Sequence, residues 1–277
     1  MQEILVVDDD SSTRRLIAGL LRAQSFAVTE AADGFEALER VEQRPFDLVL
    51  VDVWMPRMTG LDLLARLRER STCPKVVVMT ADDTPEVLLR SVREQAFRYV
   101  RKPVEPASLL ELVREVLTSK PASRPIQVIS ARPDWVELLV PCEKQSAERV
   151  HALLTGMDAD LPDQVRESIA MAFRELLMNA VEWGGKLDSS RDVRIAYLRA
   201  RRMVLYRISD PGKGFKFEDL EHSAIANAQE GSFEHVQVRE QKGLRPGGFG
   251  LMMTRALVDE LIYNEAQNEV VFIKYLD

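Results

Sequence analysis

Residues 47–60 read DLVLVDVWMPRMTG, and this stretch decides the fold of the first half of the chain. Leu48 to Val51 form a run of β-type apolar residues, which is typical of a parallel strand covered on both faces. The run ends on Asp52, and Met55 and Pro56 then stop the strand. Ligands of open parallel sheets bind at the carboxyl ends of the strands. Asp52 is therefore either a functional carboxylate or a cap at the strand end.

Around this stretch the chain alternates between strand and helix patterns five times. Strands are expected at 4–7, 26–30, 47–52, 75–80 and 97–101. Helices are expected at 11–24, 34–43, 61–70, 85–95 and 106–118, with Ser11 or Ser12 as the N-cap of the first. Because alternating strands and helices form right-handed crossovers, the pattern predicts a doubly wound five-stranded parallel sheet with helices on both faces.

Polar side chains follow the predicted strands at their carboxyl ends. They are Asp8 and Asp9 after the first strand, Asp52 after the third, Thr80 after the fourth and Lys102 after the fifth. Clustered carboxylates repel one another unless a cation lies among them, and oxygen ligands suit Mg²⁺. Lysine offers a mobile counter-charge and threonine a hydroxyl donor. The pattern predicts a site that accepts a phosphoryl group on a carboxylate.

The segments VVDD, DLVLVDVWMP, VVVMT and YVRKP, in this order, resemble the receiver domain of bacterial response regulators over residues 1–119. The resemblance implies a flavodoxin-like fold in which Asp52 is the phosphoacceptor. It implies a Mg²⁺ site made by Asp8, Asp9, Asp52 and the backbone carbonyl of Trp54. It implies three switch residues, Thr80, Tyr99 and Lys102. Lys102–Pro103 is expected to be a cis peptide bond. The face of 85–95, 97–101 and 106–118 is the expected transmitter to the rest of the chain.

The second half of the chain has a different pattern. A polar, proline-containing segment at 120–126 predicts a linker between domains at 1–119 and 127–277. After it, strands are expected at 126–131, 135–140, 193–199, 203–209, 262–263 and 270–275, and helices at 143–154, 163–183 and 251–261. This order predicts an α/β sandwich, with helices on one side of a mostly antiparallel sheet.

The helix expected at 163–183 places Glu175 and Asn179 one turn apart on a polar stripe. Glutamate can act as a general base, and an amide oxygen can bind a metal. As a bare pair they favour a solvated helix edge. Two glycine segments strengthen the functional alternative: DPGKGF at 210–215 follows a strand, and RPGGFG at 245–250 opens a helix. Glycines let backbone N–H groups approach phosphates, and helix N-termini favour anions.

Taken in order, FRELLMNAVEWGG, DPGKGF and RPGGFGLMM resemble the N, G1 and G2 boxes of the gyrase/Hsp90/histidine-kinase/MutL (GHKL) ATPase superfamily, the Bergerat fold. The likeness spans roughly residues 127 to 277 and is strongest to the anti-sigma-factor serine-kinase branch. It implies ATP and Mg²⁺ as ligands, with Glu175 catalytic, Asn179 on the metal and Asp210 reading adenine. The other ATP-binding residues it implies are Gly212, Gly214, Arg245, Gly247, Gly248 and Gly250, beneath a lid at 216–244. Trp183 departs from the histidine common in this branch.

The three histidines do not fit a sensor kinase. Such a kinase needs a phosphorylatable histidine on a dimerising helix pair, and neither His151 nor the lid residues His222 and His235 lie in such a setting. Each is expected on the surface. The second domain is therefore expected to be an output domain rather than the catalytic domain of a histidine kinase.

Composition narrows the class of protein further. The net charge is −7, and acidic residues outnumber basic ones on both sides of residue 120, which disfavours a nucleic-acid partner. The sequence has no apolar run of the ~18 residues that a membrane span needs, and its N-terminus is acidic. We expect a cytoplasmic protein without membrane association. Cys73 and Cys142 are expected to be isolated, packed thiols, which fits a reduced compartment.

The leading hypothesis is a two-component response regulator that a partner histidine kinase phosphorylates on Asp52. Its output domain would act as a serine/threonine protein kinase on an anti-sigma-factor antagonist. The alternative is a nucleotide-dependent protein that sequesters a sigma factor or similar partner with little catalysis. A nucleotide-free scaffold is a third hypothesis. The sequence leaves open a homodimer through either half.

Overall fold

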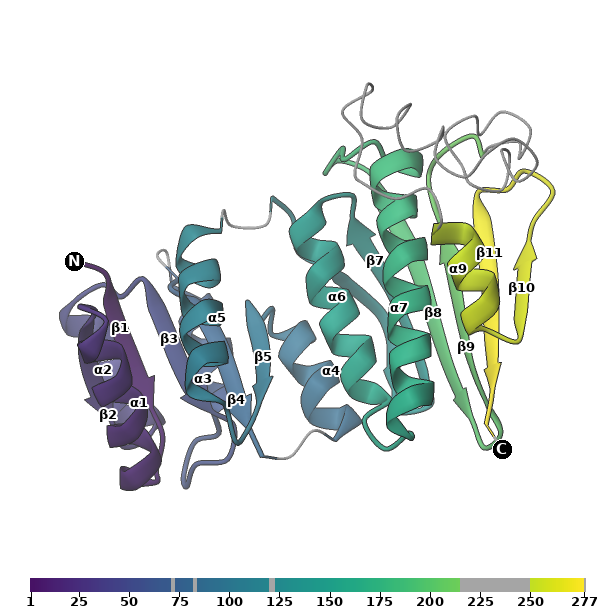
Figure 1. Cartoon of the computed structure of the whole chain (residues 1–277). Coiled ribbons are helices and arrows are strands. Elements are labelled where there is room, and N and C mark those ends of the chain that lie inside the picture. The colour runs from purple at the N-terminus through teal and green to yellow at the C-terminus, as the bar shows by residue number, and fades with distance from the viewer. Residues whose placement is uncertain (71–72, 82–83, 120–122, 215–249, 277) are drawn as a thin grey trace. The chain divides into compact units, whose positions relative to one another are not determined.

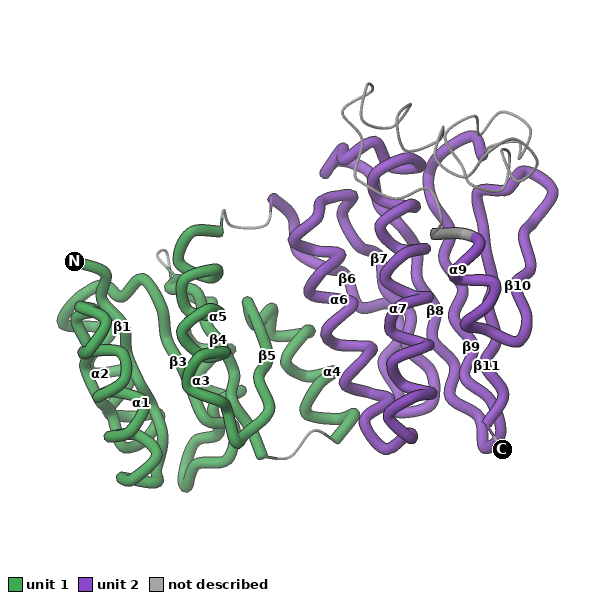
Figure 2. The backbone as a smooth tube through the Cα atoms, in the orientation of Figure 1, with its two compact units in different colours: residues 1–121 green, residues 122–277 purple. Residues whose placement is uncertain are grey.

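The structure is a computed structural model of the 277-residue chain, and it describes residues 1–70, 73–81, 84–119, 123–214 and 250–276 (Figure 1). The chain divides into two compact units, Met1–Pro121 and Ala122–Asp277 (Figure 2). Each unit has its own sheet and its own core. Residues 123–126, which the sequence assigns to the linker, lie in unit 2.

Unit 1 is the predicted doubly wound parallel domain. Its strands are β1 (Glu3–Val7), β2 (Ala27–Ala31), β3 (Leu48–Asp52), β4 (Lys75–Thr80) and β5 (Arg98–Arg101), in the order β2-β1-β3-β4-β5. Its helices are α1 (Ser11–Ala23), α2 (Gly34–Gln43), α3 (Gly60–Arg68), α4 (Pro85–Arg93) and α5 (Pro106–Thr118). All four strand pairs are parallel, so every strand ends at the same edge. The predicted fold class is confirmed.

Alternation along the strands builds two cores in unit 1, one on each face of the sheet. One set of strand residues packs with side chains of α2, α3 and α4: Leu5, Val7, Val49, Val51, Val76 and Val78. The intervening residues pack with α1 and α5: Ile4, Val6, Leu48, Leu50, Val77 and Met79. The near-continuous apolar runs follow from burial on both faces.

The N-cap of α1 corrects the prediction. Asp10, rather than Ser11 or Ser12, is the N-cap, and its carboxylate accepts hydrogen bonds from the backbone N–H groups of Ser12 and Thr13 at 3.1 Å each. Both residue types cap helices well, but a carboxylate also interacts favourably with the positive end of the helix dipole. The helix therefore begins right after the acidic loop.

Unit 2 is the predicted α/β sandwich. Its strands are β6 (Gln127–Arg132), β7 (Trp135–Pro141), β8 (Asp192–Ala200), β9 (Met203–Ser209), β10 (Glu260–Tyr263) and β11 (Glu269–Tyr275). They form an antiparallel sheet in the order β10-β11-β9-β8-β7-β6. Its helices are α6 (Lys144–Met157), α7 (Asp163–Asn179) and α9 (Gly250–Leu257), and a π-helical turn, η1 (Ala180–Gly184), continues α7. Figure 1 shows the three helices on one side of the sheet.

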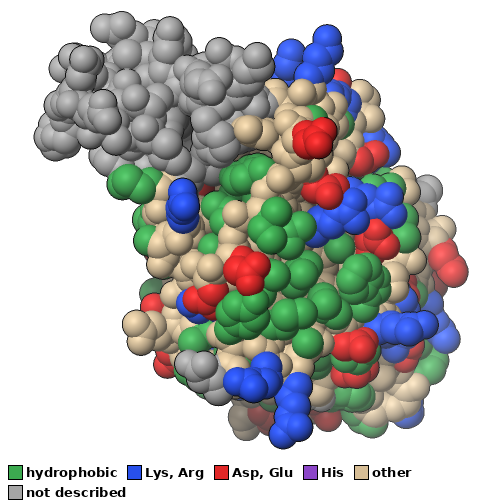
Figure 3. Space-filling model, turned by 90° about the vertical axis from the view of Figure 1, so that its right-hand side faces the viewer, with side chains coloured by type: hydrophobic (Ala, Val, Ile, Leu, Met, Phe, Trp, Pro, Cys, Tyr) green, Lys and Arg blue, Asp and Glu red, His purple; other side chains and the backbone are tan. Residues whose placement is uncertain are grey.

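The helix predicted at 251–261 is shorter than expected. It ends at Leu257, because Glu260–Tyr263 pairs with β11 as the edge strand β10. Hydrophobic side chains gather beside charged ones on the side of unit 2 that carries β10 and β11 (Figure 3). Two apolar residues of these strands, Ile262 and Tyr275, are about half exposed.

Aromatic rings and one buried carboxylate join the helices of unit 2 to its sheet. Phe173 of α7 packs against Tyr206, with ring centroids 4.7 Å apart, and Tyr206 stacks on Phe272 at 4.8 Å. Asp158, at the end of α6, is fully buried and accepts hydrogen bonds from Tyr197 Oη at 2.8 Å and Tyr206 Oη at 2.9 Å. The polar bonds fix α6 on the two central strands.

Both cysteines are free, but Cys73 is exposed rather than packed, whereas Cys142 is buried. Among the residues that the structure describes, none of the helices has the length and apolar character that crossing a membrane requires.

Candidate functional site

An acidic cluster lies at the carboxyl edge of the unit 1 sheet. Carboxylate oxygens of Asp8, Asp9 and Asp52 lie within 4.8 Å of one another. Asp8 and Asp52 are buried and Asp9 is exposed. The strands that end next to them, β1 and β3, are neighbours, so parallel pairing alone brings the acids together. An all-oxygen donor set with one exposed member fits a hard divalent cation that keeps water ligands, such as Mg²⁺.

Lys102 bridges two of these acids. Its Nζ lies 2.7 Å from Asp8 Oδ2 and 2.8 Å from Asp52 Oδ1. Burial raises the pKa of the Asp52 carboxyl, while the hydrogen bond and charge of Lys102 oppose the increase. Burial acts to lower the pKa of Lys102, but its bonds to Asp52 and Asp8 outweigh burial and raise it. The ammonium thus supplies the positive charge that the buried carboxylates need.

The switch residues predicted from the sequence lie at the ends of β4 and β5. Thr80 is fully buried, and its carbonyl accepts a 2.7 Å hydrogen bond from the backbone N–H of Lys102. Tyr99 is partly buried and pairs with Val78 in the register of the two strands. The Lys102–Pro103 peptide bond is cis, as predicted. Thr80 and Lys102 are therefore joined through the backbone.

The turn after β3 approaches the acidic cluster closely. Trp54, which the sequence proposes as a carbonyl ligand, has a half-exposed indole. A Cβ added to Gly60 would lie 2.1 Å from the Asp52 carbonyl oxygen. Any side chain at position 60 would displace the backbone of the central carboxylate, so the glycine sets the position of Asp52.

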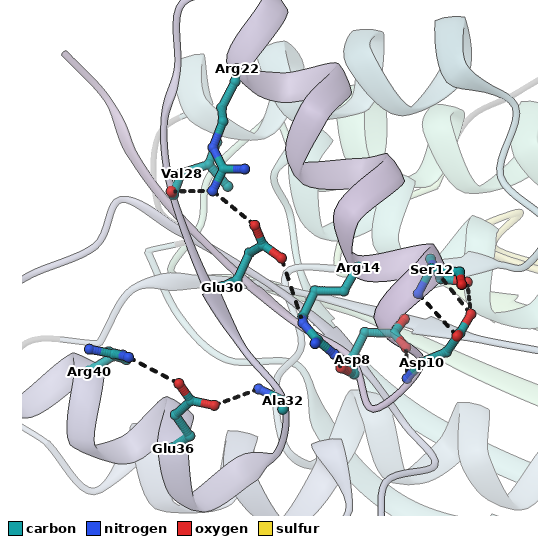
Figure 4. Close-up of polar contacts among 11 residues, drawn as sticks. Asp8, Asp10, Ser12, Arg14, Arg22, Val28, Glu30, Ala32, Glu36 and Arg40 are labelled. Atoms are coloured by element: carbon teal, nitrogen blue, oxygen red, sulfur yellow. Dashed lines mark hydrogen bonds and ion pairs between the residues drawn. The ribbon is translucent and has the colours of Figure 1, made fainter.

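Sequence reasoning missed a second layer of charges around Asp8, drawn in Figure 4. Arg14 Nη1 of α1 donates to the carbonyl oxygen of Asp8, and its Nε lies 3.7 Å from Glu30 Oε2 on β2. Glu30 also pairs with Arg22 at 3.0 Å. This chain of charges holds the β1–α1 loop that carries Asp8 and Asp9. The only signal in the sequence was an arginine one helical turn after the acids.

A second polar group lies on α7 in unit 2. Asn179 Nδ2 donates to Glu175 Oε1 at 3.2 Å, and both residues are partly buried. Apolar residues on a neighbouring face of the helix are buried: Ile169, Phe173, Leu176 and Ala180. The helix then passes into the π-helical turn, a feature often found at functional sites. The structure thus pairs the predicted base and metal ligand side by side.

Asp210 lies at the end of β9 against the glycines that follow this helix. A Cβ added to Gly184 would lie 2.2 Å from Asp210 Cγ, and one on Gly212 would lie 2.7 Å from its Oδ1. Gly212 N–H donates to Asp210 Oδ1 at 2.7 Å. Burial raises the pKa of Asp210, against the bond from Gly212 and the charge of Arg191. Gly184 lies within the segment that resembles the N box, but it was not predicted to be a site residue.

The β10–β11 hairpin supports the loop after Asp210, a contact that the sequence did not indicate. Asn268 O accepts from Asp210 N at 2.8 Å, and Asn268 Nδ2 donates to Gly212 O at 3.1 Å. Gly214 has a φ of +79°, and an added Cβ would lie 1.5 Å from Ala266 O. Only glycine fits at position 214.

Part of the predicted nucleotide site lies outside the described residues. This part comprises Arg245, Gly247, Gly248, the lid at 216–244, and His222 and His235. Gly250 is the first residue of α9. His151 is not simply a surface residue: it is partly buried, its Nε2 lies 3.0 Å from Ala170 O, and its ring stacks on Phe173.

Known proteins match both halves of the chain. The family "Response regulator receiver domain" matches residues 4–114, and "Histidine kinase-like ATPase domain" matches residues 140–274. The DNA-binding response regulator MtrA of Mycobacterium leprae is 31% identical over 211 residues, which cover 76% of this chain and 91% of that protein.

Two further proteins match the first half. The two-component response regulator ORR11 of Oryza sativa subsp. indica is 38% identical over 117 residues, 41% of this chain and 80% of that protein. The solved structure of the chemotaxis protein CheY4 of Vibrio cholerae, crystallised at pH 4.0, aligns with 42% of this chain and 98% of its own, at 30% identity and a TM-score of 0.40.

Proposed function

This chain belongs to the response-regulator family, with a receiver domain and a histidine kinase-like ATPase domain, and on that premise we propose that Asp52 is phosphorylated by a partner histidine kinase. One observation carries the proposal: Asp52 ends the central strand within 4.8 Å of Asp8 and Asp9, and its Oδ1 lies 2.8 Å from Lys102 Nζ. A carboxylate held this way suits phosphoryl acceptance, because a cation on the acids and the ammonium of Lys102 can balance the added charge.

The chemistry starts at the Asp52 carboxylate. An oxygen of Asp52 attacks the phosphorus of a phosphohistidine, the P–N bond breaks, and the imidazole leaves with its electron pair and takes up a proton. Mg²⁺, held by Asp8, Asp9, Asp52 and the Trp54 carbonyl, would neutralise charge on the phosphoryl oxygens. Lys102 then exchanges its bond to the carboxylate for one to the phosphoryl group, and the Thr80 hydroxyl donates another. Because Lys102 N–H already bonds Thr80 O, the ends of β4 and β5 move together, with Tyr99 following.

We propose that the second domain binds ATP and transfers its γ-phosphate to a serine or threonine of an anti-sigma-factor antagonist. Asp210 Oδ2 has no hydrogen-bond partner within the described part of the chain, so it can accept from the adenine amine. Glu175 would take the proton of the substrate hydroxyl as that oxygen attacks the γ-phosphorus and ADP leaves. Asn179 would bind Mg²⁺. We propose a cytoplasmic location for this activity, because the histidine kinase donor and the ATP that it requires are available there.

Three assays test the proposal on the full chain. Acetyl phosphate should modify the protein and leave Asp52→Asn unmodified. ATP should bind, and Asp210→Asn should weaken it. Transfer of labelled γ-phosphate to candidate antagonists should disappear in Glu175→Ala. Failure of acetyl phosphate to modify the protein would overturn the receiver assignment, and transfer unchanged in Glu175→Ala would overturn the catalytic one.

The alternative output is sequestration of a sigma factor or similar protein, with nucleotide setting the shape of the domain. Single-turnover assays separate the two outputs, because tight ATP binding without transfer favours sequestration. Failure to bind ATP would instead favour the nucleotide-free scaffold.

Nucleic acid is not among the partners that we propose. The name of the MtrA relative describes it as DNA-binding. For this chain, the net charge of −7 gives little attraction to phosphate backbones. Salt-sensitive retention of duplex DNA in a mobility-shift assay would contradict this part of the proposal.

A further inference from the structure

The end of the linker docks on unit 2 through Arg124. Its guanidinium donates to Ser189 O and to Asp192 Oδ2, both at 3.1 Å. The side chains of Arg124 and Asp192 are 34% and 24% exposed, so the pair is partly shielded from water. Beside it, Ser123 Oγ donates to Glu143 Oε2 at 2.8 Å. Ser123 and Arg124, which the sequence assigns to the linker, are therefore bonded to the surface of unit 2.

The loop that Arg124 holds is also the loop that packs on Asp210. This loop comprises residues 184–192. At its start Gly184 contacts the Asp210 carboxyl group, and near its end Arg191 Nη2 donates to Pro211 O. Cys142 N–H fixes the same segment by donating to Arg191 O at 2.9 Å. One short loop thus contacts the linker on one side and the turn after β9 on the other.

The other end of the linker is held in unit 1 by Lys75. Its Nζ lies 2.7 Å from Val116 O and 2.5 Å from Ser119 O, and so caps the C-terminus of α5. Lys75 is the first residue of β4, and Thr80, at the switch, is the last. From Ser119 to Ser123 there are four residue steps, which span at most about 14 Å. The covalent chain therefore keeps Ser119 and Ser123 within that distance of each other.

We propose that Arg124 is a positioning residue for the nucleotide site, and that it makes ATP affinity depend on the phosphorylation state of Asp52. By holding residues 189–192 it fixes Arg191, and through Arg191 it fixes the Pro211 turn beside Asp210. When the C-terminal end of α5 moves, the short linker pulls on Arg124. This movement strains or relaxes the bonds of Arg124 to Ser189 and Asp192. This inference rests on the proposed function, because it assigns a regulator to the same ATP site.

The test measures binding of a fluorescent ATP analogue to the full chain, with and without beryllofluoride as the phosphoryl mimic. In the wild-type chain we expect the Kd to change when beryllofluoride is added. Arg124→Ala should raise the basal Kd by about two- to fivefold, the range of a partly exposed ion pair, and should abolish the beryllofluoride response. Arg124→Lys, which keeps the charge but loses the two-acceptor geometry, should fall between them.

Three further variants control for folding and for charge. Asp192→Asn keeps the side-chain shape and should reproduce most of the Arg124→Ala effect, and the double variant should be no worse than the stronger single one. Arg132→Ala removes an exposed arginine of β6 and should behave like wild type. A wild-type Kd with an intact beryllofluoride response in Arg124→Ala overturns the inference, but it does not affect the proposal that the second domain binds ATP. A wild-type chain that binds ATP without responding to beryllofluoride also overturns it, whereas one that binds no ATP overturns the proposed function.

Discussion

Gly184→Ala is the sharpest test of the nucleotide site. The added Cβ would lie 2.2 Å from both Cγ and Oδ1 of Asp210, whereas ordinary contacts begin at 3.4 Å. Asp210 has little freedom to retreat, because its backbone N–H is bonded to Asn268 O at 2.8 Å. Asp210 Cβ would also lie 2.5 Å from the added atom, so the whole residue must shift. This shift breaks its 2.7 Å bond from Gly212 N–H and moves the carboxylate away from the adenine amine that we propose it binds.

The size of the effect follows from the bond that is lost. A hydrogen bond to a charged acceptor contributes about 1.5–3 kcal/mol net. At 1.4 kcal/mol for each factor of ten, the loss weakens ATP binding by about 10- to 150-fold. Guanine has a carbonyl where adenine has the amine, so GTP loses less, and the preference for ATP over GTP should narrow by a similar factor.

The assay is calorimetric titration of the full chain with ATP and with GTP. Gly19→Ala is the matched control, because no atom lies within 4 Å of a Cβ added there, and its affinity for ATP should not change. Combined with Asp210→Gly, which removes both the clashing carboxyl group and the clashing Cβ, Gly184→Ala should cost less than it does alone.

An unchanged Kd and an unchanged ATP/GTP ratio in Gly184→Ala would refute the reasoning, since the variant cannot keep both the clash and the base contact. Equal losses for ATP and GTP would also count against it, because they would indicate a general collapse of the domain rather than loss of an adenine contact.

Three other predictions concern buried polar groups and one close backbone contact. Asp158→Ala leaves the hydroxyls of Tyr197 and Tyr206 without their acceptor, so the unfolding free energy of unit 2 should fall by about 3–5 kcal/mol in urea denaturation, and a change below 1 kcal/mol would contradict the network. Gly60→Ala should slow phosphorylation by acetyl phosphate at least ~10-fold, because its Cβ would lie 2.1 Å from the Asp52 carbonyl oxygen; a wild-type rate would reject this. The pKa of Asp52 is raised on folding, so the folded state binds the extra proton between the usual value of 3.8 and the raised one, and stability falls as pH rises through that window. Asp52→Asn should therefore raise the Tm of unit 1 at pH 7, with the difference shrinking toward pH 4, and equal Tm values at both pH values would exclude this cost.

The receiver half of the fold follows directly from local patterns. Each strand of unit 1 is short, apolar and bounded by turn residues, and each helix has a regular apolar stripe, so their order is visible residue by residue. The meeting of Asp8 with Asp52 then follows because parallel neighbouring strands end at one edge. The long helix of unit 2 was predicted for the same reason, and its Glu175–Asn179 spacing placed both side chains together.

Contacts that join distant segments were not predictable in this way. The bond of Arg124 to Asp192 and that of Asn268 to Gly212 depend on which loops the fold brings together. Each of these residues alone resembles an ordinary polar surface residue. The Asp10 N-cap was decided by competition among adjacent residues that can all cap a helix, and the early end of α9 by the pairing of β10 with β11.

The sequence by itself determined the two folds, their order and the acids at the sheet edge. The reason is that burial on one face of a helix or strand produces a periodic pattern of apolar residues within each segment. Only the tertiary structure decided which charges hold those acids, which glycine contacts Asp210 and how the linker is attached. Most of those contacts join residues far apart in the sequence, and a single side chain leaves no periodic signal of its partner.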